Sequence, residues 1–287
     1  MRRDIVLPVL AVAGGVAGFF LRRWQLASAY DPETELFVHS APATGALLGL
    51  TALLALAFLL AVLKKKEGLD DFLPAFGSPG SGQMTVLTAA GFLLFAAGGL
   101  GMQEGFRGLR LWKANPAMYQ LSIPGTQLLA GVLCVLAAFG VLLLGRMAYR
   151  GALRDSACRL APLPALAGVV WLFSAHLQSG IEPELLKYSF QLAAICLLTL
   201  AHYYTAGFLF GRACRQRAMF FSLLGGALGL LSLADRPDLF TAAALLAYSL
   251  SALNFAKALL RSTFGPPWPK RLEGRMPPAE EEHTDGA

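Results

Sequence analysis

Long apolar segments constrain this chain more than any other feature of its sequence. Each segment has 17 to 24 residues, and short polar stretches separate them. A helix that crosses the hydrocarbon core of a membrane needs about 20 apolar residues, because each residue adds about 1.5 Å. The segments lack the two-residue alternation of barrel strands, and a helix satisfies its own backbone hydrogen bonds in lipid. The sequence therefore predicts an all-α integral membrane protein, a bundle of eight transmembrane helices at Ile5–Leu21, Ala41–Leu63, Thr85–Met102, Ile123–Leu144, Pro162–Gln178, Tyr188–Gly211, Ala218–Ala234 and Leu239–Leu260.

The composition agrees with a chain surrounded by lipid. Hydrophobic residues make up 56% of the 287 residues and charged residues only 15%, whereas soluble proteins carry about 25% charged residues. This balance excludes a water-soluble globular enzyme. We predict one polytopic membrane domain over residues 1–262. Residues 263–287 are rich in proline and glutamate, so we predict a disordered cytoplasmic tail there.

The distribution of Lys and Arg predicts the orientation, because basic loops are retained in the cytoplasm. On the eight-helix assignment, 17 of the 24 basic residues fall on one side, together with both termini. We therefore expect both termini in the cytoplasm and the protein in the cytoplasmic membrane. The basic residues lie between apolar segments and do not cluster with stacking aromatics, so no nucleic-acid partner is expected. The other side holds Arg22, Arg23, Arg107, Arg110, Lys113, Lys187 and Arg236.

The first segment has an alternative interpretation as a cleaved signal peptide. Arg2 and Arg3 precede it, and Ala27-Ser28-Ala29 resembles a cleavage site. Cleavage would leave seven helices. Arg22 and Arg23, which lie between the apolar run and that site, favour a retained helix.

Residues 103–121 follow the third segment and carry Phe106, Leu109 and Trp112 at three-residue spacing, beside basic residues. This pattern is typical of an amphipathic turn at the lipid headgroups. An extension of the third helix explains it equally well.

Glycines cluster in three of the shortest segments, at Gly14-Gly15, Gly98-Gly99 and Gly225-Gly226. Glycine allows two helices to approach closely, and this is the simpler interpretation. Helices interrupted at a binding site, as in transporters built from two halves, are the alternative.

Charged residues are almost absent from the apolar segments. Every Asp and Glu lies outside them, and Lys257 is the only Lys or Arg within them. This pattern disfavours an ion pump with a carboxylate relay, a two-carboxylate hydrolase and a metal site within the bilayer. His176 and His202 lie at different depths, so they are not expected to flank a haem. We predict no cofactor, no metal and no catalytic residue, and leave open whether the protein is an enzyme.

The sixth segment carries the only polar face that suggests a site. At about 100° per residue, four polar residues of this segment and Glu184 just before it fall within an arc of about 80°. Unpaired polar groups in lipid cost several kcal/mol, so this face should meet other helices or water. The residues are Glu184, Tyr188, Gln191, Thr199 and His202.

Two interpretations of this polar face remain open. Its residues form hydrogen bonds between helices, or they line a pocket or pathway in which His202 is the titratable group. We expect its partners on the fifth and eighth segments. The candidates are Trp171, Ser174 and Gln178 on the fifth, and Tyr248, Ser251 and Asn254 on the eighth.

These observations predict a multi-pass membrane protein that acts through helix contacts, as an accessory or scaffold component with a membrane-protein partner. The alternative is a transporter for a neutral or weakly basic small molecule, with its pathway along the sixth segment. An intramembrane enzyme is the third class. The sequence contains no complete catalytic constellation that would support it.

Overall fold

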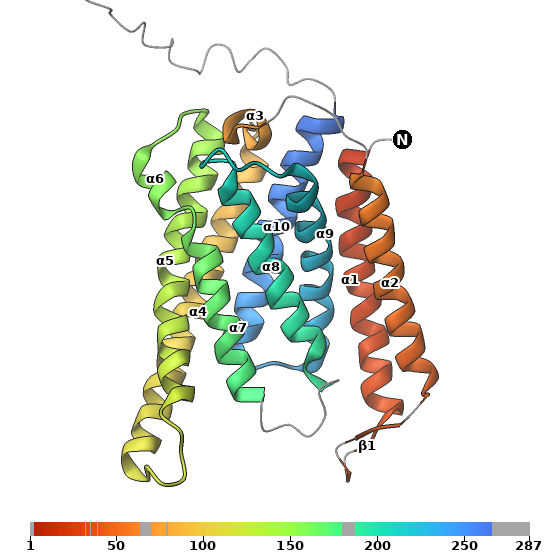
Figure 1. The fold of residues 1–287 in the computed structure, drawn as a ribbon, viewed down its shortest axis with the longest axis vertical. Coiled ribbons are helices and arrows are strands. Elements are labelled where there is room, and N and C mark those ends of the chain that lie inside the picture. Colours follow the sequence, from red (N-terminus) through yellow and green to blue (C-terminus); the bar gives the residue numbers. More distant parts are fainter. Residues whose placement is uncertain are drawn as a thin grey trace, which may run out of the picture.

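The computed structural model describes residues 3–31, 33–34, 36–38, 40–63, 70–78, 80–179 and 187–265. Long helices form a bundle and run alternately up and down along one axis (Figure 1). Of the predicted tail, residues 263–287, the part from residue 266 onward lies outside the described residues. The long helices are α1 (Arg3–Ser28), α2 (Pro42–Val62), α4 (Ser81–Ala114), α5 (Ser122–Arg150), α7 (Leu163–Ser179), α8 (Ser189–Gly207), α9 (Arg215–Ser232) and α10 (Leu239–Phe264).

Seven of these helices, within the described part of the chain, are long and apolar enough to cross a membrane. They correspond to seven of the eight predicted segments, so a multi-pass, all-α membrane protein is supported. The sixth predicted segment forms α8, which has 19 residues and is not among these seven. It begins one residue later than predicted and ends at Gly207, four residues earlier.

Short elements connect the long helices. Two-residue strands β1 (Tyr30–Asp31) and β2 (Leu36–Phe37) form an antiparallel pair between α1 and α2. Three further turns of helix lie at the ends of the bundle. These are α3 (Phe72–Phe76), α6 (Asp155–Leu160) and η2 (Leu233–Asp235).

α4 is the longest described helix, and it continues from Ser81 to Ala114, into the segment that begins at Gln103. Its 34 residues correspond to about 51 Å, compared with about 30 Å for the hydrocarbon core. Phe106 and Trp112 therefore belong to an extension of the helix, the second of the two interpretations above. Together, α4 and α5 project beyond the other helices at this end (Figure 1).

Local chemistry explains where several helices begin and end. The Asp238 side chain accepts a hydrogen bond from the Thr241 backbone N–H at 2.9 Å, and so caps the start of α10. Gly151 ends α5 with a φ of 69°, a left-handed conformation that glycine adopts without strain. The chain then turns back towards α6.

The core is built around α9 and α10, the most buried of the seven apolar helices. α10 packs against α4, α9 and α1, and α9 also packs against α8 and α1. α2 is the least buried, because it contacts only α1 and α9 substantially. The start of α1 and the end of α10 lie at the same end of the bundle (Figure 1).

Candidate functional site

His202 of α8 and Ser251 of α10 form a buried pair at the centre of the bundle. The imidazole Nδ1 lies 2.8 Å from the Leu198 carbonyl, and Nε2 lies 2.9 Å from Ser251 Oγ. A carbonyl can only accept, so Nδ1 carries the proton, and in neutral histidine Nε2 is an acceptor for the Ser251 hydroxyl. The Ala247 carbonyl, 2.9 Å from Ser251 Oγ, is a second acceptor for the same hydroxyl. His202 is 3% exposed and Ser251 is fully buried. The pair therefore joins α8 to α10 inside the protein.

Aromatic rings surround this pair. The Tyr248 ring packs edge-on against His202 with centroids 4.8 Å apart, and Trp171 packs against Tyr248 at 5.5 Å. The Tyr248 hydroxyl donates to the Pro164 carbonyl at 2.7 Å. Trp171 Nε1 is buried and has no hydrogen-bond partner among the described residues. Helices α7, α8 and α10 thus share one core of contacting rings and hydrogen bonds.

Thr199 lies at the contact between α7 and α8. Its hydroxyl donates to the Ile195 carbonyl one turn earlier, at 2.7 Å. A side chain at Gly168 of α7 would collide with Thr199 Oγ1, so the two helices approach closely at this point. Thr199 is 8% exposed and packs against protein.

The other residues predicted for the polar face of α8 are not brought into this core. Gln191 and Tyr188 are half-buried near the start of α8, and Tyr188 precedes the first helical residue. The Gln191 side chain has no hydrogen bond to a described residue. Glu184 lies outside the described residues. Asn254 of α10 donates to the Gln83 carbonyl of α4 at 3.1 Å, away from His202.

Ser174 and Gln178 of α7 belong to a second polar cluster, which the sequence analysis did not predict. Both donate to Gln127 Oε1 of α5, at 2.9 and 2.6 Å. Gln127 in turn donates to Glu104 of α4 at 3.0 Å. A cavity of about 320 Å³ lies beside Glu104, Gln127 and Gln178. This cluster joins α4, α5 and α7. It contains the carboxylate of Glu104, which lies outside the predicted segments.

Arg22 forms a third cluster, which the sequence analysis also did not predict. This side chain of α1 is fully buried. Its Nε donates to Asp235 at 2.6 Å, Nη1 to Gln25 at 2.7 Å, and Nη2 to the Lys187 carbonyl at 2.7 Å. Gln25 continues the network to Thr44 of α2 at 2.9 Å. The cluster ties α1 to α2, η2 and the start of α8.

One sequence signal would have identified Arg22 as buried. The inner face of α1 follows helical spacing through Gly14, Gly15 and Gly18, and the same face continues to Arg22 and Gln25. Because the predicted first segment ends at Leu21, Arg22 and Gln25 were expected in the loop that follows it. An arginine on the glycine face of a longer helix needs a buried acceptor, which Asp235 provides.

The His202 and Ser251 pair has the spacing of a base and a nucleophile. The base, however, is oriented by a backbone carbonyl, and neither residue lines the cavities beside Arg212, Lys257, Glu104 or Arg146. A substrate would reach the pair only if the helices separated. Among the described residues, no group of three or more His, Cys, Asp or Glu side chains is placed to hold a metal ion.

Comparison with protein families, with curated proteins and with solved structures finds no match to this chain.

Proposed function

We propose that this protein is an accessory or scaffold component of the cytoplasmic membrane that acts through helix contacts with another membrane protein. The proposal includes eight transmembrane helices, α8 among them, with both termini in the cytoplasm. One observation carries it: the central polar side chains of α8 are paired inside the bundle. His202 forms a hydrogen bond with Ser251 of α10, and Thr199 bonds to the Ile195 carbonyl and packs against Gly168 of α7. Such contacts hold membrane helices together.

The edge helix α2 offers the face that a partner helix would contact. Gly45 and Gly49 are exposed, and a side chain added at either would meet nothing within 4 Å. Ala52 is also exposed and continues this face at helical spacing. Two glycines four residues apart let a second helix approach closely. The rest of this face is apolar, so a transmembrane helix fits it better than a soluble protein.

We expect Gly49→Leu to disrupt the partner contact without unfolding the protein. The leucine would fill open space, and removing a helix-interior glycine favours the helix by about 1 kcal/mol. The measurement is photo-crosslinking in native membranes from a benzoylphenylalanine at Ala52. We expect one discrete higher-mass adduct, reduced at least tenfold by Gly49→Leu. Ala46→Leu, on the same helix but outside this face, is the matched control and should keep the adduct. An absent adduct, or equal loss in both variants, would contradict the contact.

The alternative function is a transporter for a neutral or weakly basic solute. It is favoured by the His202 and Ser251 pair, which lies where a pathway along α8 would pass. Such a pathway would require α7 and α10 to move away from α8. The third class, an intramembrane enzyme, would require the same movement before a substrate met Ser251.

Two substitutions separate the scaffold from the transporter. With a scaffold, we expect His202→Ala to lower the thermal unfolding midpoint, because it removes a buried ring and a hydrogen bond. Gln191→Ala should change stability by less than about 0.5 kcal/mol, as is usual for an unpaired partly exposed residue. Unfolding is then repeated with a panel of neutral and weakly basic solutes. A solute that stabilises the parent protein and neither variant would support the transporter instead.

A further inference from the structure

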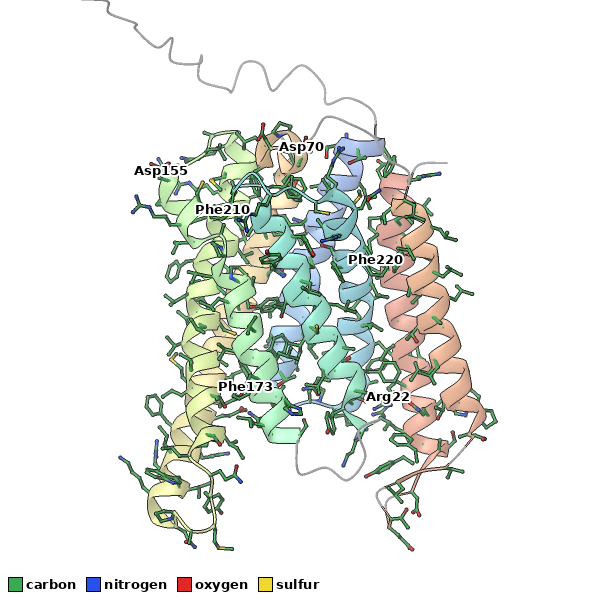
Figure 2. All side chains as sticks on the ribbon, viewed as in Figure 1. Arg22, Asp70, Asp155, Phe173, Phe210 and Phe220 are labelled. Carbon is green, nitrogen blue, oxygen red and sulfur yellow. The ribbon has the colours of Figure 1, made fainter. Side chains whose placement is uncertain are left out.

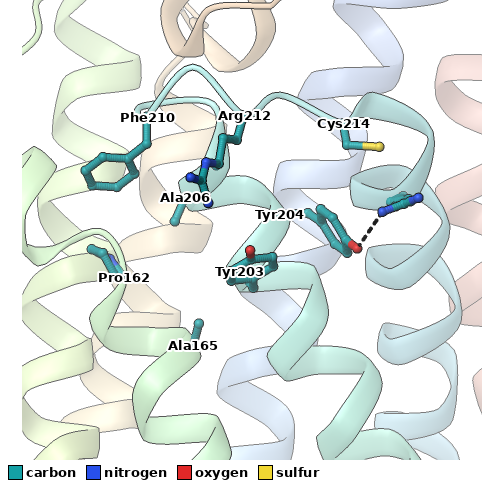
Figure 3. A pocket seen from close by; sticks show the side chains of 10 residues that line it. Pro162, Ala165, Tyr203, Tyr204, Ala206, Phe210, Arg212 and Cys214 are labelled. Atoms are coloured by element: carbon teal, nitrogen blue, oxygen red, sulfur yellow. Dashed lines mark hydrogen bonds between the residues drawn. The ribbon is translucent and has the colours of Figure 1, made fainter.

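A cavity of about 620 Å³ lies at the end of the bundle where the chain starts and where α10 ends (Figures 1 and 3). It is bounded by the end of α8, the loop to α9 and the start of α7. The volume greatly exceeds that of a phosphate ion. Its wall combines apolar residues, Pro162, Ala165 and Ala206, with two arginines, Arg212 and Arg217.

The loop between α8 and α9 forms part of the wall of this cavity. The Gly207 carbonyl accepts hydrogen bonds from the backbone N–H of Phe210 at 3.2 Å and of Arg212 at 2.9 Å. Gly211 adopts a φ of 65°, which lets the chain turn sharply between them. Phe210 and Arg212 are therefore held over the cavity by a defined turn (Figure 3).

Aromatic contacts hold the second arginine. Arg217 donates to the Tyr204 hydroxyl at 3.3 Å, the dashed line in Figure 3, and its guanidinium lies 5.8 Å from the centre of that ring. The Tyr204 ring in turn stacks on Phe221, with centroids 5.5 Å apart and an interplanar angle of 3°. This arrangement fixes the position of the charge while leaving Arg217 exposed.

The two positive charges have no carboxylate partner within the part of the chain that the structure describes. The ion pair between Arg22 and Asp235 lies at the opposite end of the bundle, where Figure 2 labels Arg22. Arg212 and Arg217 are both exposed and line the same cavity. An anion with an apolar portion would match both the charges and the walls.

We propose that this cavity binds the phosphate group of an anionic phospholipid. Arg212 and Arg217 contact the phosphate, and an acyl chain lies along the apolar wall formed by Pro162, Ala165 and Ala206. Basic cavities between transmembrane helices at the cytoplasmic side bind anionic headgroups in this way. Inorganic phosphate shares the charge but leaves the apolar wall without a partner. The proposal does not depend on the scaffold function.

Other cavities at this end provide a matched control. One of about 130 Å³ is lined by Arg146, Arg150 and Arg154. Another is lined by Lys257 and Arg261 together with Asp4. A general attraction between this basic end and anionic lipid would depend on all of these residues. A specific site would depend on Arg212 and Arg217.

The test measures lipid binding to the purified full-length protein in neutral detergent by native mass spectrometry. The probes are phosphatidylglycerol and phosphatidylcholine with identical acyl chains. We expect a preference for phosphatidylglycerol, and about 30-fold weaker binding of it by Arg212→Gln/Arg217→Gln, because each charge contributes about a factor of five. The control Arg150→Gln/Arg154→Gln removes the same charge and should bind within threefold of the parent. Equal binding of both lipids, or equal loss in both double variants, would overturn the proposal.

A second readout comes from Cys214, which lines the cavity and is half-buried. In a Cys158→Ser/Cys196→Ser background, phosphatidylglycerol should slow maleimide labelling of Cys214 at least fivefold. Phosphatidylcholine and sodium phosphate should leave the rate unchanged. Equal protection by sodium phosphate would show a site for a free anion and overturn the lipid assignment. Labelling requires no substitution of an arginine, so a variant that fails to fold would not affect this result.

Discussion

Replacing Arg22 with methionine is expected to destabilise this protein by about 3 to 5 kcal/mol, the usual cost of removing one partner from a buried ion pair. Arg22 is fully buried, and Asp235 is 11% exposed in its side chain. The substitution leaves the Asp235 carboxylate without its cation. It also removes three hydrogen bonds, one to Gln25 within α1 and two that link α1 to Asp235 and Lys187. The measurement is equilibrium unfolding in mixed micelles with increasing sodium dodecyl sulfate.

Two further variants make this prediction specific. Arg23 is the next residue and is exposed, so Arg23→Met should stay within about 0.5 kcal/mol of the parent. The double variant Arg22→Met/Asp235→Leu removes both charges. It should recover most of the lost stability, because apolar replacements of a whole buried pair are often neutral. Equal effects of Arg22→Met and Arg23→Met would show that the pair contributes nothing.

A substitution at Gly98 is expected to separate α4 from α5. A Cβ atom at Gly98 would lie 2.5 Å from Val135 Cγ2 and 2.8 Å from the Gly131 carbonyl oxygen. The valine side chain can rotate, but the backbone of Gly131 can yield only if the helix shifts. Gly98→Val should therefore cost about 3 kcal/mol, the upper part of the range for overpacked cores. Unfolding in the same micelles measures it.

The neighbouring glycine is the control. A Cβ at Gly99 meets nothing within 4 Å, and Gly99 is exposed on the same helix. Gly99→Val removes the same conformational freedom and adds the same volume, so only the packing differs. We expect it to leave stability within about 0.5 kcal/mol. A similar loss in both variants would mean that the α4 and α5 contact adapts easily.

Hydropathy and helical periodicity predict much of this fold. The apolar segments predict the seven long apolar helices, because lipid allows little else. The spacing of Thr199 and His202 places both on one face of α8, and both are buried. The adjacent glycines Gly98 and Gly99 show the limit of prediction from hydropathy and periodicity. The pattern identifies glycines suited to packing, but only the rotation of the helix decides which of the two meets α5.

The partners across helices could not be predicted for the same reason. Ser174 and Gln178 were expected near the polar face of α8, but both donate hydrogen bonds to Gln127 of α5. A mostly apolar helix can pack at several rotations with similar hydrophobic burial, so the sequence leaves its polar partners undetermined. Arg22 was missed for a different reason. The hydropathy pattern ends before the helix does, because the last turns of α1 carry the polar residues Arg22 and Gln25, which are buried.

The link between Arg22 and Asp235 also has a consequence for biogenesis, since 213 positions separate the two residues. Ribosomes add about 5 to 20 residues per second, so Asp235 emerges about 10 to 40 seconds after Arg22. During that interval Asp235 is not yet available to accept a hydrogen bond from Arg22. The first helix must therefore remain near the translocon or at the membrane surface. Assembly of this protein can thus be completed only late in translation, when nearly the whole chain has been made.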